Sequence, residues 1–114
     1  MAKLESARLF DLDGKDVKRI KLPTPCRITL HLQTVWQGSP SEKISQSVRF
    51  VPPKGKPVRQ PETPLVTSPE GKIDYILEMR NLPTEIPGIY NVEILYGGSL
   101  AKKFFFQVEQ DYIQ

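Results

Sequence analysis

The fold of this chain is decided by residues 87–108, PGIYNVEILYGGSLAKKFFFQV. Two runs rich in β-branched and aromatic residues flank a pair of glycines, which is the pattern of a β-hairpin. In the first run the face with Tyr90, Val92, Ile94 and Tyr96 is apolar. An isolated two-stranded hairpin is marginally stable in water, so this face needs a second apolar layer to cover it.

The length of the hairpin loop fixes the register. A turn made of Gly97 and Gly98 alone places Val92 opposite Lys103 and forces a lysine onto the buried face. A loop of residues 97–99 instead pairs Tyr96 with Leu100, Val92 with Phe104 and Tyr90 with Phe106. We favour the longer loop, because a slip of one residue moves every apolar side chain to the other face. Lys102 then lies near the open end, where its amine reaches solvent.

Four further segments alternate apolar and polar residues with the period of a half-buried strand. They are Ser6–Leu12, Cys26–Trp36, Lys43–Val51 and Lys72–Arg80. The chain contains 11 prolines, all between the alternating runs, and proline cannot donate a hydrogen bond to a β-ladder. Residues 52–69 hold six of these prolines, so we expect a long proline-rich loop there.

These patterns predict an all-β fold. We expect six to seven strands and find no segment with helical periodicity, so the prediction is an immunoglobulin-like antiparallel β-sandwich. A chain of 114 residues leaves room for one hydrophobic core, so residues 1–114 are expected to form a single domain.

The composition limits which cellular compartment and which kinds of partner we expect. The formal net charge of +3 is a mild excess of base, compatible with an acidic partner or with nucleic acid. The single cysteine, Cys26, excludes an internal disulfide. No signal-peptide core and no apolar run of membrane-spanning length is present. We therefore expect a cytoplasmic protein that does not bind a membrane.

Several motifs together resemble a known group of proteins. They are DLDGK at residues 11–15, a Leu-Pro at 22–23 before an alternating strand, an Asn-Leu-Pro at 81–83, the closing PGIYNVEILYGG at 87–98, and FFFQV at 104–108. This arrangement is similar to small uncharacterised bacterial immunoglobulin-like β-sandwich proteins, a family of unknown function. The resemblance covers most of the chain and implies the fold; it brings no active site with it.

The residue types that carry chemistry are scarce. Cys26 and His31 lie five positions apart on one predicted strand, so they point to opposite faces of the sheet. Asp11, Asp13 and Asp16 resemble part of a calcium loop, but position 22, where the closing glutamate would stand, is Leu22. We predict no catalytic residue, no metal site and no cofactor, and expect that the protein is not an enzyme.

The outer face of the hairpin is the first candidate site. If Phe104 and Phe106 point into the core, Phe105 points outward, on the same side as Ile89 and Leu95. Three exposed apolar side chains mark an interface, unless another part of the chain, such as Tyr112 and Ile113, folds over them. The leading hypothesis is a non-catalytic protein-protein interaction module, an accessory subunit or adaptor that binds another protein or itself through Ile89, Leu95 and Phe105.

A basic segment provides the alternative. Residues 43–59 contain no acidic residue and carry Lys43, Arg49, Lys54, Lys56 and Arg59. A strand and loop of this charge can follow a phosphate backbone, which would make the chain a nucleic-acid-binding accessory protein. The two hypotheses differ in salt dependence, because only phosphate contacts weaken steeply with added salt.

Overall fold

The computed structural model describes residues 1–110, and in this range the chain is built from strands and turns without a helix. The strands are β1 (Lys3–Phe10), β2 (Arg19–Leu22), β3 (Ile28–Gln37), β4 (Lys43–Val51), β5 (Val58–Arg59), β6 (Thr63–Val66), β7 (Lys72–Leu82), β8 (Gly88–Tyr96) and β9 (Ser99–Gln110). No helix in the described range is long and apolar enough to cross a membrane.

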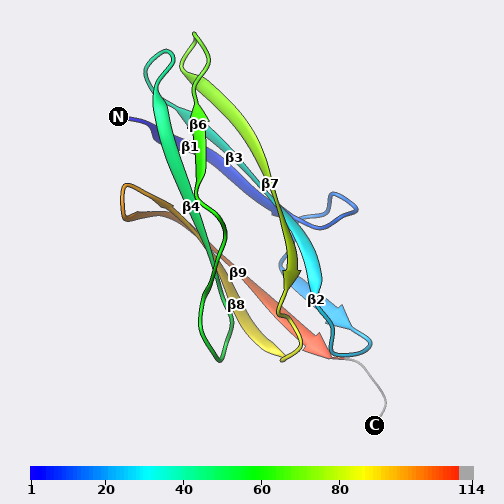
Figure 1. Ribbon diagram of the computed structural model, residues 1–114. Coiled ribbons are helices and arrows are strands. Elements are labelled where there is room, and N and C mark those ends of the chain that lie inside the picture. Colours follow the sequence, from blue (N-terminus) through cyan, green and yellow to red (C-terminus); the bar gives the residue numbers. More distant parts are fainter. Residues whose placement is uncertain (111–114) are drawn as a thin grey trace.

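The strands form two sheets that pack face to face (Figure 1). The smaller sheet has the order β1-β3-β7, and the larger has the order β2-β9-β8-β4-β5, with β6 also pairing with β4. All pairs are antiparallel except β2 with β9, which is parallel. The sandwich is elongated, with extents of 56 × 28 × 17 Å. The predicted immunoglobulin-like β-sandwich is confirmed.

The hairpin of β8 and β9 combines the two registers that the sequence allowed. Tyr96 pairs with Ser99, so the turn consists of Gly97 and Gly98 alone, and the expected three-residue loop is wrong at the tip. Both glycines have positive φ, 59° and 79°, as a tight hairpin turn of this kind requires. The register shifts between Ile94 and Leu95, and the inner pairs become those expected: Val92 with Phe104 and Tyr90 with Phe106. A bulge beside the turn therefore restores the apolar face.

Alternate residues from both sheets fill the core. In β3, Leu30, Leu32, Thr34 and Trp36 are buried, as the alternation of that strand predicts. Within the larger sheet, the rings of Tyr90 and Phe106 stack with centroids 5.5 Å apart, and the ring of Phe50 lies 5.4 Å from that of Tyr90. This aromatic cluster is the centre of the core at the lower end of the hairpin.

One polar side chain links the two sheets inside the core. Gln46 of β4 is 1% exposed, and its Oε1 accepts hydrogen bonds from Thr34 Oγ1 at 2.7 Å and from Trp36 Nε1 at 2.8 Å. These two donors would otherwise be buried without a partner, at a cost of about 1–3 kcal/mol each. Gln46 therefore ties β4 to β3 where the alternation alone predicts an apolar residue.

The proline-rich segment is more ordered than the sequence suggested. Residues 52–69, expected to lack any ladder, contain β5 and β6, which pair with the two halves of β4. Pro64 lies within β6, opposite Ser45, and this is possible because β6 is an edge strand on which an absent N–H costs nothing. β2, which is not among the segments whose alternation predicted a strand, pairs with residues 107–110 of β9.

Tyr90 closes the lower end of the sandwich. It is fully buried, and its hydroxyl donates a 2.6 Å hydrogen bond to the carbonyl of Ile86, four residues upstream. A tyrosine at the start of a strand that bonds back to the preceding turn is a hallmark of immunoglobulin-like sandwiches. Burial of Tyr90 raises the pKa of its hydroxyl, and the nearby Glu85 carboxylate raises it further.

Candidate protein-interaction surface

The outer face of the hairpin exposes two of the three predicted apolar residues together. Phe105 of β9 is 61% exposed and Ile89 of β8 is 50% exposed. Phe105 pairs with Asn91 and Ile89 pairs with Gln107, so the two apolar side chains are diagonal neighbours on one face. Diagonal pairs across a ladder lie about 7–8 Å apart, within reach of an aromatic side chain. Ile89 and Phe105 therefore form one small apolar patch.

Leu95 lies away from this patch. It is six positions along β8 from Ile89, a distance of about 20 Å at the rise of a strand, and it is half-buried beside Leu100. It lines a separate hollow of about 220 Å³ with residues of β4 and the segment that follows β5. The predicted three-residue set is thus divided into Ile89 with Phe105 at one place and Leu95 at another.

A group of charged side chains lies between the Ile89–Phe105 patch and Leu95. The carboxylate of Glu93 lies 2.6 Å from the guanidinium of Arg49 and 3.5 Å from the amine of Lys103, and Glu93 is only 8% exposed. The Lys103 amine also lies 5.7 Å from the centre of the Phe105 ring, a cation-π distance. The exposed aromatic ring is therefore held beside a fixed network of charges.

The five basic residues of segment 43–59 do not form one surface. Arg49 forms an ion pair with Glu93. Arg59 lies opposite Arg49 in the ladder between β4 and β5. Lys43 begins β4, at the opposite end of that strand from the loop that carries Lys54 and Lys56. Lys54 and Lys56 line a cleft at the lower end of the sandwich, whereas Arg49 and Arg59 line the separate hollow beside Leu95.

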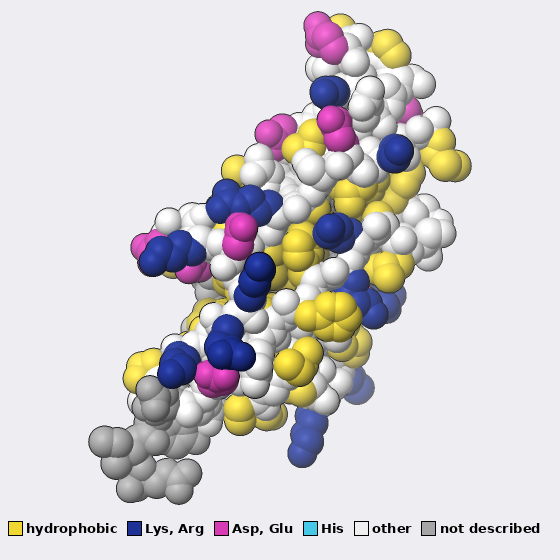
Figure 2. Space-filling view, turned by 180° about the vertical axis from the view of Figure 1, so that it is seen from behind, with side chains coloured by type: hydrophobic (Ala, Val, Ile, Leu, Met, Phe, Trp, Pro, Cys, Tyr) yellow, Lys and Arg dark blue, Asp and Glu magenta, His cyan; other side chains and the backbone are white. Residues whose placement is uncertain are grey.

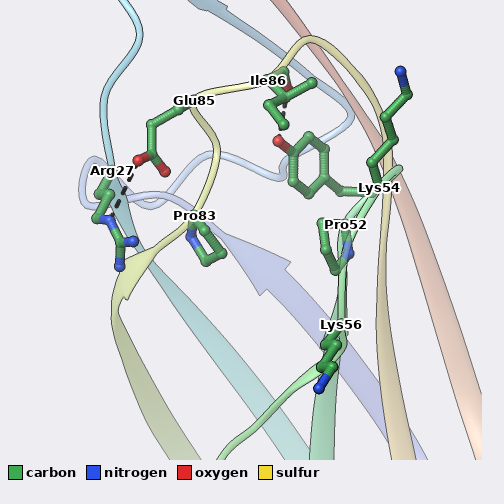
Figure 3. Close-up of a pocket in the computed structure, with 8 residues that line it drawn as sticks. Arg27, Pro52, Lys54, Lys56, Pro83, Glu85 and Ile86 are labelled. Carbon is green, nitrogen blue, oxygen red and sulfur yellow. Dashed lines mark hydrogen bonds and ion pairs between the residues drawn. The ribbon is translucent and has the colours of Figure 1, made fainter.

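This cleft has a volume of about 360 Å³ and is lined by Arg27, Pro52, Lys54, Lys56, Pro83, Glu85, Ile86 and Tyr90. Figure 3 shows Arg27 and Glu85 facing each other on one wall, and their charged groups lie 3.5 Å apart. Lys54 and Lys56 extend in opposite directions from the other wall (Figure 3). Sequence reasoning missed Arg27, because only the fold brings the residue before β3 to the loop after β4.

The residues considered for chemistry take structural positions. Cys26 is partly buried against the core, and His31 lies on the other face, with its ring 5.4 Å from that of Phe10 and its Nε2 3.7 Å from Glu78. The Glu78 pKa is lowered, chiefly by a hydrogen bond from Arg80. The carboxylate of Asp11 accepts 2.9 Å hydrogen bonds from the backbone N–H groups of Asp13 and Lys15, so it serves the turn. Within residues 1–110 no three potential metal ligands come together.

Comparison with known proteins identifies the fold and no family. No family model matches the chain, and no curated protein matches it in sequence. Among solved structures, the chain is similar to an immunoglobulin-like protein of Pseudomonas aeruginosa, with a TM-score of 0.57, 9% identity, and coverage of 96% of this chain and 97% of that one. At this identity the likeness shows the fold alone.

Parts of larger enzymes have the same fold. The Pseudomonas fluorescens alkylpurine DNA glycosylase AlkC, solved bound to DNA with an abasic site analog, matches 95% of this chain with a TM-score of 0.69 and 12% identity. A Listeria innocua β-glucosidase matches all of it with a TM-score of 0.65 and 13% identity. The chain spans only 30% of the glycosylase and 16% of the glucosidase.

Proposed function

We propose that this chain is a non-catalytic interaction module of the cytoplasm, an accessory subunit or adaptor, that binds another protein through the outer face of β8 and β9. The observation that supports this most is the exposure of Phe105, at 61%, on a regular strand beside Ile89. An aromatic residue on a rigid sheet loses little conformational freedom on binding and buries a large area, and such residues dominate the energy of protein interfaces.

The surroundings of Phe105 favour the same proposal. The Lys103 amine stands beside the ring and is linked through Glu93 to Arg49, in the arrangement of an apolar anchor with a polar rim. Because Glu93 is already paired, these charges contribute orientation and specificity rather than most of the binding energy. Loss of the Phe105 ring should therefore weaken binding more than loss of any one rim charge.

The test compares two exposed apolar side chains on opposite sheets. Ile76 of β7 is 53% exposed, so Ile76→Asp is a matched control for Phe105→Asp. Wild type and both variants are used to capture partners from cell lysate, with nuclease present, after circular dichroism has shown that each is folded. We expect a defined protein to be captured by wild type and Ile76→Asp and lost with Phe105→Asp. Capture of the same protein by all three would contradict the proposal.

The cleft at Lys54 and Lys56 supports a second candidate, binding of nucleic acid. Arg27 lies on the wall opposite the two lysines, and the carboxylate that lines the cleft, that of Glu85, lies 3.5 Å from Arg27. Two lysines that extend in opposite directions suit an extended chain of phosphates better than one small anion. The similar glycosylase was solved with DNA, but the basis of this candidate is the cleft.

A salt titration tests it. Fluorescence anisotropy with labelled single- and double-stranded DNA should show binding that weakens steeply between 50 and 200 mM salt. The double variant Lys54→Glu, Lys56→Glu should abolish it, and Lys43→Glu, at the other end of β4, should not. Equal losses from both variants would show a nonspecific charge effect and reject the cleft as a site.

A further inference from the structure

One edge of the larger sheet is open over most of its length. β9 pairs with β8 on one side, and on the other side β2 pairs only with residues 107–110. Among the strands of the described range, none pairs with residues 99–106 on that side. An unpaired edge presents a row of N–H and C=O groups that can accept another strand.

The direction of these groups follows from the β2 contact. The N–H of Gln107 points to β2 and donates a 3.0 Å hydrogen bond to the carbonyl of Lys18. In a regular strand, backbone groups two residues apart point the same way. The N–H and C=O groups of Lys103 and Phe105 therefore point to the open edge, in line with the position that β2 occupies further along.

Two hollows lie along this edge, between β9 and the edge of β1. One of about 350 Å³ lies beside Ser99, Leu100 and Ala101, with Leu4 and Trp36 in its wall. The other, of about 220 Å³, lies beside Phe104 and Phe105, with Ala7 and Val17 in its wall. Figure 2, which shows the molecule from behind, has a diagonal band of hydrophobic side chains on its surface. The hollows are about four residues apart along the strand, or roughly 13 Å.

Charge on this side is positive. In Figure 2 lysine and arginine side chains stand on both sides of the hydrophobic band, with acidic side chains among them, and the segments that border the open edge carry Lys3, Arg8, Lys18, Lys102 and Lys103. Three acids near this edge are paired: Asp16 lies 2.5 Å from Arg8, Glu93 lies 3.5 Å from Lys103, and Glu5 lies 3.5 Å from Lys72. Among the described residues, Lys3, Lys18 and Lys102 have no ion-pair partner, and their charge favours an acidic occupant.

We infer that the open edge of β9 binds an extended, acidic segment of a partner protein, which adds to the larger sheet as a strand beside residues 99–106. This inference rests on the proposed function and specifies the kind of partner. The bound segment is about seven residues long, with apolar side chains at positions i and i+4 filling the two hollows and acidic side chains between them. A second copy of this chain fits poorly, because antiparallel pairing of two such edges brings lysines 102 and 103 against their counterparts.

The probe is a displayed library of random nine-residue peptides, selected on the wild-type chain. Enriched peptides should show the apolar i, i+4 spacing with acidic residues between. Each is then synthesised with N-methyl groups on alternate residues. Strand addition predicts that methylation of one alternate set abolishes binding and methylation of the other set has little effect, because only one edge of the peptide bonds to β9.

Two substitutions of Lys103 distinguish the contribution of its backbone N–H to binding from that of its charge. Lys103→Pro removes an N–H that faces the open edge and leaves the ladder with β8 intact, whereas Lys103→Gln removes the charge and keeps the N–H. We expect Lys103→Pro to weaken binding by about tenfold or more, and Lys103→Gln by only a few fold. Circular dichroism and thermal unfolding establish that both variants fold.

Failure of this inference differs from failure of the proposed function. If no peptide is enriched, or if the enriched peptides bind Lys103→Pro as well as Lys103→Gln, strand addition is wrong. A lysate partner that is lost with Phe105→Asp and kept with Lys103→Pro leaves the side-chain interface standing and rejects strand addition. Peptides that bind Phe105→Asp normally and lose affinity only for Lys103→Pro support strand addition and reject Phe105 as the anchor.

Discussion

Phe105 and Phe106 are adjacent in sequence and identical in chemistry, yet Phe105 is 61% exposed and Phe106 is 1% exposed. Phe106 stacks on Tyr90 inside the sandwich, whereas Phe105 stands on the outer face beside the charges of Lys103 and Glu93. Because successive side chains of a strand point to opposite faces of the sheet, one ring is in the core and the other is on the surface. The inner face of the hairpin packs in the core, and its outer face exposes Phe105 and Ile89 to solvent.

The largest expected effect separates the two rings directly. Phe106→Ala should lower the free energy of unfolding by about 3–5 kcal/mol, because it removes a ring from a closed aromatic cluster and leaves a cavity. Urea denaturation followed by circular dichroism measures this loss. Phe106→Leu keeps more of the volume and should cost less, which provides a second point if the alanine variant does not fold. Equal losses for Phe106→Ala and Phe105→Ala would refute the assignment of the faces.

The next effect concerns the hydroxyl that ties Tyr90 to the turn before β8. Tyr90→Phe keeps the stacked ring and removes the 2.6 Å hydrogen bond to the carbonyl of Ile86. We expect a loss of about 1.5 kcal/mol in the same denaturation measurement. Since the turn at 83–87 also lines the cleft of Figure 3, hydrogen exchange in that turn should become faster than in the upper half of β8. Unchanged exchange there would show that the hydroxyl does not fix the turn.

The same hydroxyl makes stability depend on alkaline pH. Burial raises the pKa of Tyr90 above the ordinary tyrosine value of about 10. Tyr90 ionises at a lower pH in the unfolded chain than in the folded protein. The stability that the neutral hydroxyl of Tyr90 contributes is therefore fully present below pH 10 and is lost as pH rises through the folded pKa. Wild type should therefore lose stability more steeply than Tyr90→Phe above pH 10. Parallel curves for the two proteins would contradict a raised pKa.

The alternation of apolar residues was enough to predict the main strands and the inner face of the hairpin. The pairs of Val92 with Phe104 and of Tyr90 with Phe106 follow from burial, because only one register keeps the apolar sets together. The tip was mispredicted, since two glycines accept either loop length and a bulge can restore the register further along. Burial constrains pairs in the core and leaves the exposed turn undetermined.

Short strands escaped prediction for a different reason. β5 and β6 contain two and four residues, too few for a period to be visible, and Pro64 within β6 suggests a loop. Both strands form by pairing with the edge of β4, and this edge exists only once the sheet has assembled. The same holds for the candidate site: the outward direction of Phe105 follows from alternation, but the pairing of Glu93 with Arg49, 44 residues away, depends on the register between β4 and β8.

The charged centre beside Phe105 should have a modest effect on stability. Glu93→Gln keeps the shape of the side chain and removes the charge that faces Arg49 and Lys103. We expect a loss of about 1 kcal/mol, because both cations are about one-third exposed and can recover hydration. The loss should shrink in 0.5 M salt, which screens partly exposed pairs. A loss that does not change with salt would point to packing rather than charge.

The smallest expected effect on stability belongs to the residue with the largest expected effect on binding. Phe105→Asp removes an exposed ring and should change the free energy of unfolding by no more than about 0.5 kcal/mol, as surface substitutions usually do. Lys103 lies close enough to the new carboxylate to offset part of the lost ring contact. If urea denaturation instead shows a loss comparable to that of Phe106→Ala, the ring of Phe105 is part of the packing. The outer face would then be a second layer of the core, with no surface left for a partner at this position.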